Sequence, residues 1–178
     1  TIHLSGEFNY NKYANIGASH GSARHIMISN NDVIFQIGWL DELLQASHEL
    51  VSPHEPRDIR QQDIKENTIG DITGKHFSGW CFMITRKLWL DIGGFDEDFG
   101  FWFADDSVIQ QCIAKNVYPM IVKKSVVHHL GSQTFKSLTL EVKDNYTWGL
   151  TERFNTKYNK NKFEDNQEYQ RWKISQSQ

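Results

Sequence analysis

The sequence predicts an α/β fold in which a mixed, mostly parallel sheet is flanked by helices and followed by a helical carboxyl-terminal tail. Two observations predict this class. The run at 26–29 is uncharged and apolar or small, as expected for a strand covered on both faces. Segments with helical spacing of apolar residues, at 38–46 and 104–113, alternate along the chain with strand-like runs.

The strand-like run ends in Asn30, Asn31 and Asp32, and a second apolar group follows at 33–35. In open α/β sheets, ligands bind just beyond the carboxyl ends of such strands, which places Asp32 where chemistry usually occurs. Asn and Asp also favour turns through local hydrogen bonds. A plain turn is therefore the alternative, and it is the more common meaning of such a stretch taken alone.

The composition indicates one globular domain, since 178 residues with 39% hydrophobic content can bury one sizeable core. Nineteen Lys and Arg against 22 Asp and Glu give a formal charge of −3, so nucleic acid is not an expected partner. Cys81 and Cys112 have apolar neighbours and no metal-ligand spacing, which fits free thiols in a reducing, cytoplasmic compartment.

The termini and hydropathy carry less information. No run approaches the length of a membrane span, and the amino end lacks a signal-peptide pattern. Because the chain does not begin with Met, a processed chain or a fragment is expected.

In the first half of the chain, residues 1–24 have loop or short-helix composition, and a short helix around 15–19 would lead into the strand. The helix at 38–46 is expected to pack on the sheet. Residues 51–75 are polar, contain two prolines and show no period. We expect there a long excursion, either a lid or binding loop or an ordinary surface insertion.

Residues 76–85 return to a strand-like composition, in which Gly79 suggests a bend or a close approach by a ligand. A short helix at 86–92 should stop at a Gly-Gly pair. The acidic, aromatic and glycine-rich segment 93–103 is an improbable helix or strand and should be a shaped loop.

A helix beginning at Ala104 or Asp105 and two short strands at 117–122 and 125–130 complete the expected core. We divide the chain into this core, residues 1–137, and a tail, residues 138–178. The tail is helical at first, and its last polar stretch is expected to be disordered.

Acidic or imidazole side chains stand at the ends of three expected elements: Asp32 after one strand, the pair Asp105 and Asp106 at a helix start, and the pair His128 and His129 after another strand. A carboxylate and an imidazole together could hold a divalent cation, and a second carboxylate could act as a general base. Helix capping alone could explain the aspartate pair. Adjacent histidines on a strand point to opposite faces, so at most one would face a site.

The order of these motifs resembles the carboxyl-terminal two-thirds of a GT-A-fold glycosyltransferase, most similar to the family 2 inverting enzymes. The resemblance covers about residues 8–135, and its most specific part is the Gly-Gly-Phe-Asp-Glu block that begins at Gly93. The matching segments, in chain order, are 15–21, 26–32, 79–86, 92–99, 104–107 and 126–132.

This resemblance implies a metal site. Asp32 would be the last residue of an Asp-X-Asp-type motif that contacts the metal bridging the donor diphosphate. Asn30 stands in place of the first acid of that motif. His128 or His129 would supply a further ligand.

It also implies a base and a set of substrate contacts. Asp105 aligns with the catalytic base of a Glu-Asp-X-Asp pattern, and Ala104 and Ser107 replace the outer acids, which leaves Asp106 as a rival base. Trp80 and Trp102 would be suited to stack on sugar rings. The expected substrate-binding residues are Asn15, Asn30, Asn31, Gly79, Trp80 and Trp102.

The implied reaction transfers a sugar from a nucleotide-diphosphate sugar to a carbohydrate or other hydroxyl acceptor, with inversion. A carboxylate accepts the proton of the attacking hydroxyl. Mn²⁺ or Mg²⁺ would neutralise the leaving diphosphate.

One departure concerns the start of the chain. Family members normally begin with two βα units that hold the donor nucleotide, so this chain resembles an incomplete Rossmann-like half. It would be a fragment, a partner of another chain or a reduced variant. The sheet would expose an edge next to 26–29, which self-association into a homo-oligomer would cover.

Two rival functions belong to other classes. A non-catalytic carbohydrate- or nucleotide-binding module of the same fold is favoured by the replacements at Ala104 and Ser107. A metal-dependent hydrolase using Asp32 and the histidines would need an open metal position and usually three protein ligands, which the spacing does not obviously provide.

Overall fold

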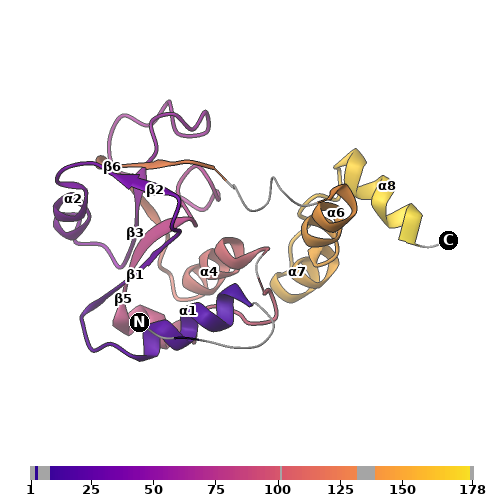
Figure 1. Cartoon of the computed structure of the whole chain (residues 1–178), viewed down its shortest axis with the longest axis horizontal. Coiled ribbons are helices and arrows are strands. Elements are labelled where there is room, and N and C mark those ends of the chain that lie inside the picture. Colours follow the sequence, from indigo (N-terminus) through magenta and orange to yellow (C-terminus); the bar gives the residue numbers. More distant parts are fainter. Residues whose placement is uncertain (1–2, 4–8, 101, 132–138, 177–178) are drawn as a thin grey trace.

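The computed structural model describes residues 3, 9–100, 102–131 and 139–176 (Figure 1). Strands and helices alternate along the chain, which confirms the predicted α/β class. The elements are α1 (Tyr10–Ser19), β1 (His25–Ser29), β2 (Val33–Phe35), α2 (Trp39–Gln45), β3 (Leu50–His54), β4 (Thr68–Ile69), β5 (Cys81–Thr85), α3 (Arg86–Ile92), α4 (Ala104–Ile113), β6 (Met120–His129), α6 (Leu140–Trp148), α7 (Thr151–Tyr158) and α8 (Gln167–Gln176).

The strands form one sheet in the order β1-β5-β3-β6-β2, with β4 paired to β6. β3 and β6 run parallel, whereas the pairs β1–β5, β3–β5, β2–β6 and β4–β6 are antiparallel. The sheet is mixed, as predicted, but the expectation that it is mostly parallel is wrong for the described strands. An apolar run indicates burial on both faces and does not fix the direction of a strand.

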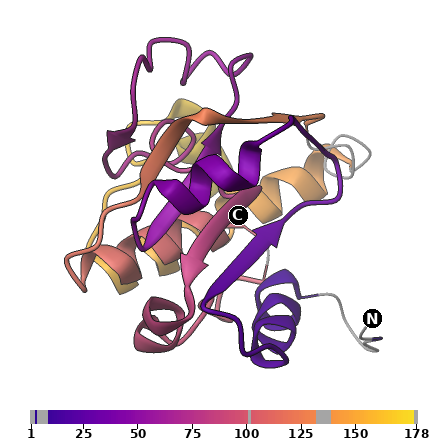
Figure 2. The same cartoon turned by 90° about the vertical axis from the view of Figure 1, so that its left-hand side faces the viewer.

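Helices cover both faces of the sheet (Figures 1 and 2). On one face, Leu43 of α2 packs in a cluster with Val51, Met83 and Val122. On the other face, residues of α1, α3 and α4 join a larger cluster that includes Phe82 and Ile84 of β5. Successive residues of β5 thus enter opposite layers, as strand geometry requires. The predicted helices at 38–46, 86–92 and 104–113 match α2, α3 and α4.

The structureless excursion predicted from residue 51 to residue 75 is wrong at its start. β3 lies between β5 and β6, and all five of its residues are buried. The strand is short and contains Pro53, which cannot donate to a strand ladder and usually marks an edge. The register with β6 shifts between Pro53 and His54, where the chain begins to leave the sheet.

Gln61 holds the excursion that follows β3. Its side chain is fully buried, and its Nε2 donates to O of Gly74 at 2.8 Å and to Oγ of Ser78 at 3.0 Å. Its Oε1 accepts from N of Glu55 at 2.8 Å. One buried amide therefore ties both ends of the excursion to the end of β3.

β6 is a single strand where the sequence predicts two. Its first part pairs with β3 and β4, and its last part pairs with β2. The residues between Val122 and Val126 fall in the register shift against β3 and include two lysines. These polar residues interrupt the apolar pattern, although the strand continues through them.

β1 pairs with β5 alone among the described strands, so its other edge carries no strand. This confirms the open edge expected next to 26–29. β1 is also less buried than β3 or β5, since Ile26 is its buried residue and Ser29 is exposed.

The last helices lie to one side of the sheet (Figure 1). Phe154 of α7 packs in an aromatic cluster with Phe99 and Phe103. α8 buries Tyr169, so the expected disorder of the last stretch is wrong for residues 167–176. Aromatic contacts supply the burial that the polar composition of this stretch obscures. Ser132, the last motif residue, and the boundary at 137 lie outside the described residues, and the division there stays a prediction.

Replacing Gln61 by Ala should lower the free energy of unfolding by roughly 2–4 kcal/mol, because buried groups of Glu55 and Gly74 would lose their partners. Urea unfolding followed by circular dichroism measures this. Gln62 is the matched control, because it is the exposed neighbour of the same residue type. An equal effect of Gln62→Ala would contradict the role given to Gln61.

Candidate functional site

The end of β6 brings His129 next to Asp32. Val33 of β2 is the register partner of His129, so the residue that precedes β2 lies beside the last residue of β6. Oδ1 of Asp32 is 3.2 Å from Nε2 of His129. This distance suits an ion pair, but the direction is not that of a hydrogen bond, and Nε2 is buried with no hydrogen-bond partner among the described residues. A carboxylate oxygen and an imidazole nitrogen facing each other in this way resemble two ligands of one cation.

His128 turns away from Asp32. Neighbouring side chains on a strand point to opposite faces, and Nδ1 of His128 lies 3.1 Å from Oε1 of Glu55. Of the two histidines predicted as metal ligands, the structure brings His129 to Asp32 and places His128 against a buried carboxylate.

Glu55 is a residue of this site that the sequence reasoning missed. Its side chain is 6% exposed. Its oxygens accept from N and Nε of Arg57, both at 3.0 Å, from Nη2 of Arg57 at 2.8 Å, and from N of His129 at 2.6 Å. Nη2 of Arg57 also donates to O of His129 at 3.3 Å. The two side chains therefore bond the backbone of His129 where β3 has turned away from β6.

The charge of Glu55 is stabilised by these donors. Burial by itself would raise the pKa of Glu55, but hydrogen bonds from Arg57, His128 and His129 outweigh it and lower the pKa to about 2. Glu55 is consequently an anion over the whole physiological range. No local pattern indicated this role, since Glu55 is one of several charged residues in a polar segment.

Gly79 brings the carboxylate of Asp105 toward this end of the sheet. A Cβ added at Gly79 would lie 2.3 Å from Cβ of Asp105, so the first turn of α4 packs directly on the backbone before β5. The next residue, Trp80, stacks on the imidazole of His129 with ring centroids 4.9 Å apart. At Gly79, where the sequence predicts a bend or a close approach by a ligand, the group in close approach is the side chain of Asp105. Gly79 and Trp80 thus link Asp105 to His129.

Asp105 and Asp106 have different surroundings. Oδ1 of Asp106 accepts from Oγ1 of Thr73 at 2.6 Å and forms an ion pair with Nζ of Lys162. Asp105 accepts from N of Asp106 at 2.9 Å. Burial, and then the charge of Asp106, raise the pKa of Asp105 to about 6, while Lys162 acts in the opposite direction. Asp105 is therefore the better placed of the two to take up a proton.

The other predicted substrate contacts are distributed over the scaffold. Asn15 donates to O of Phe95 and accepts from N of Phe95, which joins α1 to the glycine-rich loop. Trp102 packs on the aromatic cluster of Phe99, Phe103 and Phe154. Asn30 donates its N–H to O of Trp80 at 2.8 Å, and Asn31 is exposed. Their contacts with substrate stay predictions.

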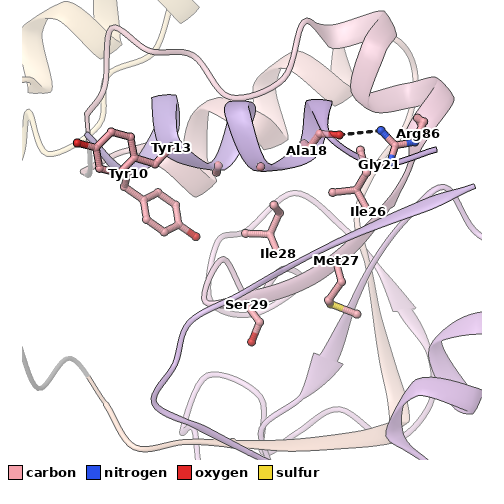
Figure 3. Close-up of a pocket in the computed structure, with 11 residues that line it drawn as sticks. Tyr10, Tyr13, Ala18, Gly21, Ile26, Met27, Ile28, Ser29 and Arg86 are labelled. Atoms are coloured by element: carbon pink, nitrogen blue, oxygen red, sulfur yellow. Dashed lines mark hydrogen bonds between the residues drawn. The ribbon is translucent and has the colours of Figure 1, made fainter. Parts of the chain in front are cut away.

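A groove of about 380 Å³ runs between α1 and the open edge of β1 (Figure 3). Arg86 lines one end, where its Nη1 donates to O of Ala18 at 2.8 Å. Tyr10 and Ser29 line the groove away from Arg86 (Figure 3). Because Ser29 precedes Asp32 by three residues, the groove follows β1 toward the Asp32 end.

Solved structures show the class of fold, which is that of GT-A-type glycosyltransferases and confirms the GT-A fold that the sequence resemblance implies. The mannosyltransferase PcManGT from Pyrobaculum calidifontis, in complex with GDP-Man and Mn²⁺, matches with a TM-score of 0.56 and 19% identity over 72% of this chain and 38% of that chain. GalNAc-T7, with UDP, GalNAc and Mn²⁺, matches with a TM-score of 0.56 and 12% identity over 68% of this chain and 30% of that chain.

The chain thus spans well under half the length of these two proteins. No protein-family model and no curated protein sequence matches it. At such identities the likeness establishes the fold alone. Among residues 3, 9–100, 102–131 and 139–176, no helix is long and apolar enough to cross a membrane, and no three His, Cys, Asp or Glu side chains gather as a metal cluster.

Replacing Glu55 by Gln should lower the free energy of unfolding by on the order of 3 kcal/mol at neutral pH, because Arg57 and the N–H of His129 lose a charged acceptor. The folded pKa lies below the ordinary 4.5, so the contribution of the carboxylate is complete above 4.5 and disappears as the pH falls through about 2. The stabilities of the two proteins should therefore converge in acid.

Thermal unfolding of both proteins from neutral pH down to about pH 2 tests this convergence. Asp63→Asn is the control, because that carboxylate pairs with Lys75 and is 68% exposed. Its effect should be much smaller. A constant difference between wild type and Glu55→Gln at every pH would argue against the charge of Glu55 as the cause.

Proposed function

We propose that this chain transfers a sugar from a nucleotide-diphosphate sugar to an acceptor hydroxyl, with inversion at the anomeric carbon and with Mn²⁺ or Mg²⁺. The observation that carries the proposal is the pair of Asp32 Oδ1 and His129 Nε2, 3.2 Å apart, with Asp105 linked to it through Gly79 and Trp80. The fold supports it, because both matched proteins were solved with Mn²⁺ and with GDP-Man in one case and UDP in the other.

Asp32 and His129 fit a divalent cation. Two ligands at right angles, each about 2.1 Å from a six-coordinate cation, lie about 3 Å apart. The measured separation is 3.2 Å, and the buried Nε2 has no hydrogen-bond partner among the described residues. Two protein ligands leave positions for water and phosphate oxygens. A bound cation would supply the positive charge that stabilises the leaving diphosphate.

Asp105 is the proposed base. The acceptor oxygen attacks the anomeric carbon while Asp105 accepts its proton, and the bond from that carbon to the diphosphate oxygen breaks. The electron pair of the broken bond leaves with the nucleoside diphosphate, and attack from the opposite face inverts the configuration. A pKa of about 6 makes Asp105 a stronger base than an ordinary carboxylate, and it is still largely ionised at neutral pH.

The groove beside β1 is the proposed place for the nucleoside of the donor. Tyr10 and Tyr13 line it, and it follows β1 toward the Asp32 end of the strand. A cytoplasmic location, and self-association through the open edge of β1, belong to the same proposal.

A non-catalytic carbohydrate- or nucleotide-binding module is the second candidate. Ala104 and Ser107 stand where the resemblance places acids, and Asp106 is engaged by Thr73 and Lys162. Such a module would bind the donor without turning it over, so binding and transfer are measured separately.

The first measurement is thermal unfolding with a panel of nucleotide sugars, with and without Mn²⁺. A donor at a hundred times its dissociation constant should add about 2.7 kcal/mol of stability. We expect a Mn²⁺-dependent shift that disappears in Asp32→Ala and persists in Asp41→Ala, a change at an exposed acid of α2. A shift that persists in both variants would mean that the cation binds elsewhere. No shift with any donor would count against both candidate functions.

Transfer to a hydroxyl acceptor distinguishes the base. Asp105→Asn should reduce the rate by about 10²-fold or more while donor binding persists, and Asp106→Asn should cost less. The neutral amide should not reduce stability, because burial already disfavours the ionised form of Asp105. The wild-type rate should fall as the pH drops through about 6. Donor binding without any transfer by the wild type would favour the module.

A further inference from the structure

Lys162 reaches the candidate site from the carboxyl-terminal tail. It lies in the turn between α7 and α8. The side chain of Asn155 accepts from N of Lys162 at 2.8 Å and donates to O of Lys162 at 3.0 Å, so the backbone of Lys162 is held at both polar groups. The tail therefore presents this residue in a fixed position.

The ammonium of Lys162 has two kinds of partner. Nζ lies 2.5 Å from Oδ1 of Asp106. It also lies 5.5 Å from the ring centroid of Phe103, 5.8 Å from that of Phe154 and 5.5 Å from that of Phe163. Aromatic faces attract a cation, and the side chain of Lys162 is only 29% exposed, which strengthens both interactions. The position of the Lys162 side chain is therefore defined by several contacts, unlike that of an exposed surface lysine.

Two adjacent carboxylates repel each other, so in a buried pair one usually takes up a proton more readily. Lys162 and the hydroxyl of Thr73 both bind Oδ1 of Asp106. Other groups also act on Asp105: Arg60 from the excursion is cationic, and Tyr10 from α1 is neutral because burial and then Asp105 raise its pKa to about 12. Among the side chains that the structure describes, Lys162 is the cation that forms an ion pair with Asp106.

We propose that Lys162 is a positioning residue that engages Asp106 in an ion pair and leaves Asp105 as the carboxylate that exchanges its proton. This inference rests on the proposed function, because it concerns the base of that reaction. The proposal makes the carboxyl-terminal tail part of the catalytic unit, because the positive charge beside the aspartate pair belongs to Lys162, which follows α7 in the chain. A merely structural role would instead hold the aromatic cluster together and leave the titration of Asp105 unchanged.

Lys162→Met separates these roles, because Met keeps an apolar stem among the aromatic rings and removes the charge. Carbon-detected NMR titration of the Asp105 carboxyl, assigned by comparison with Asp105→Asn, is the direct measurement. With the charge removed, Asp106 repels the ionised form of Asp105 more strongly, so the midpoint should move to higher pH by on the order of one unit. Lys162→Arg should restore most of the original midpoint.

Lys173→Met is the matched control. Lys173 also lies over an aromatic ring of the tail, 5.2 Å from the centroid of Tyr169, and it pairs with Glu164 rather than with the aspartates. Its loss should leave the midpoint of Asp105 unchanged. An unchanged midpoint in Lys162→Met, or an equal shift in Lys173→Met, would overturn the inference.

The titration needs no substrate, so its result is independent of the proposed activity. A shifted midpoint in a protein that transfers no sugar would keep the role of Lys162 and reject the reaction. Where transfer is measurable, the acid limb of the rate profile should move with the midpoint. If Lys162→Met does not give a folded spectrum, Lys162→Gln takes its place, with the same expected direction.

Discussion

The buried carboxylate of Glu55 is the constraint on which the rest of this end of the molecule depends. β3 leaves β6 after His54, so on the side opposite β2 the backbone of His129 would face no strand. Glu55 and Arg57 replace the lost strand by bonding the N–H and the C=O of His129. A single buried charge is costly unless several donors surround it, and five hydrogen bonds from three residues meet that condition here. β6 can therefore continue far enough to bring His129 to Asp32.

Charge also connects the tail to the core. Lys157 of α7 pairs with Asp96 and Asp98 of the acidic loop, and Arg153 pairs with Asp98. The loop itself is shaped by Gly93 and Gly94, which both have positive φ angles that other residues rarely adopt. The acidic residues that make this segment improbable as a helix or strand thus serve as a docking surface for α7, and the aromatic cluster around Phe154 adds apolar burial beneath it.

The sequence allowed those parts of the fold to be predicted in which local pattern and tertiary environment agree. The stripe at 38–46 and the stop at Gly93 are local signals, and both appear where expected. The sequence did not predict β3, because Pro53 and the polar residues beside it do not have the pattern of a buried strand. The strand is buried only because other strands lie on both sides of it. In the candidate site, Asp32 follows a strand and Asp105 lies in the first turn of a helix, which are both recognisable places, whereas the contacts of Glu55 with His128 and His129 join residues more than seventy positions apart. Contacts between residues so far apart in the chain produce no recognisable spacing of residues in the sequence.

The open edge of β1 has a consequence for anything that pairs with it. The N–H of Asn30 bonds to Trp80 of the segment before β5, and because bonding alternates along an antiparallel strand, the backbone groups of Met27 and Ser29 point away from β5. An added strand would therefore meet donors and acceptors spaced two residues apart. A slip of one residue would turn all of its side chains from the groove beneath α1 to the opposite layer. The edge thus selects a partner by register as well as by composition.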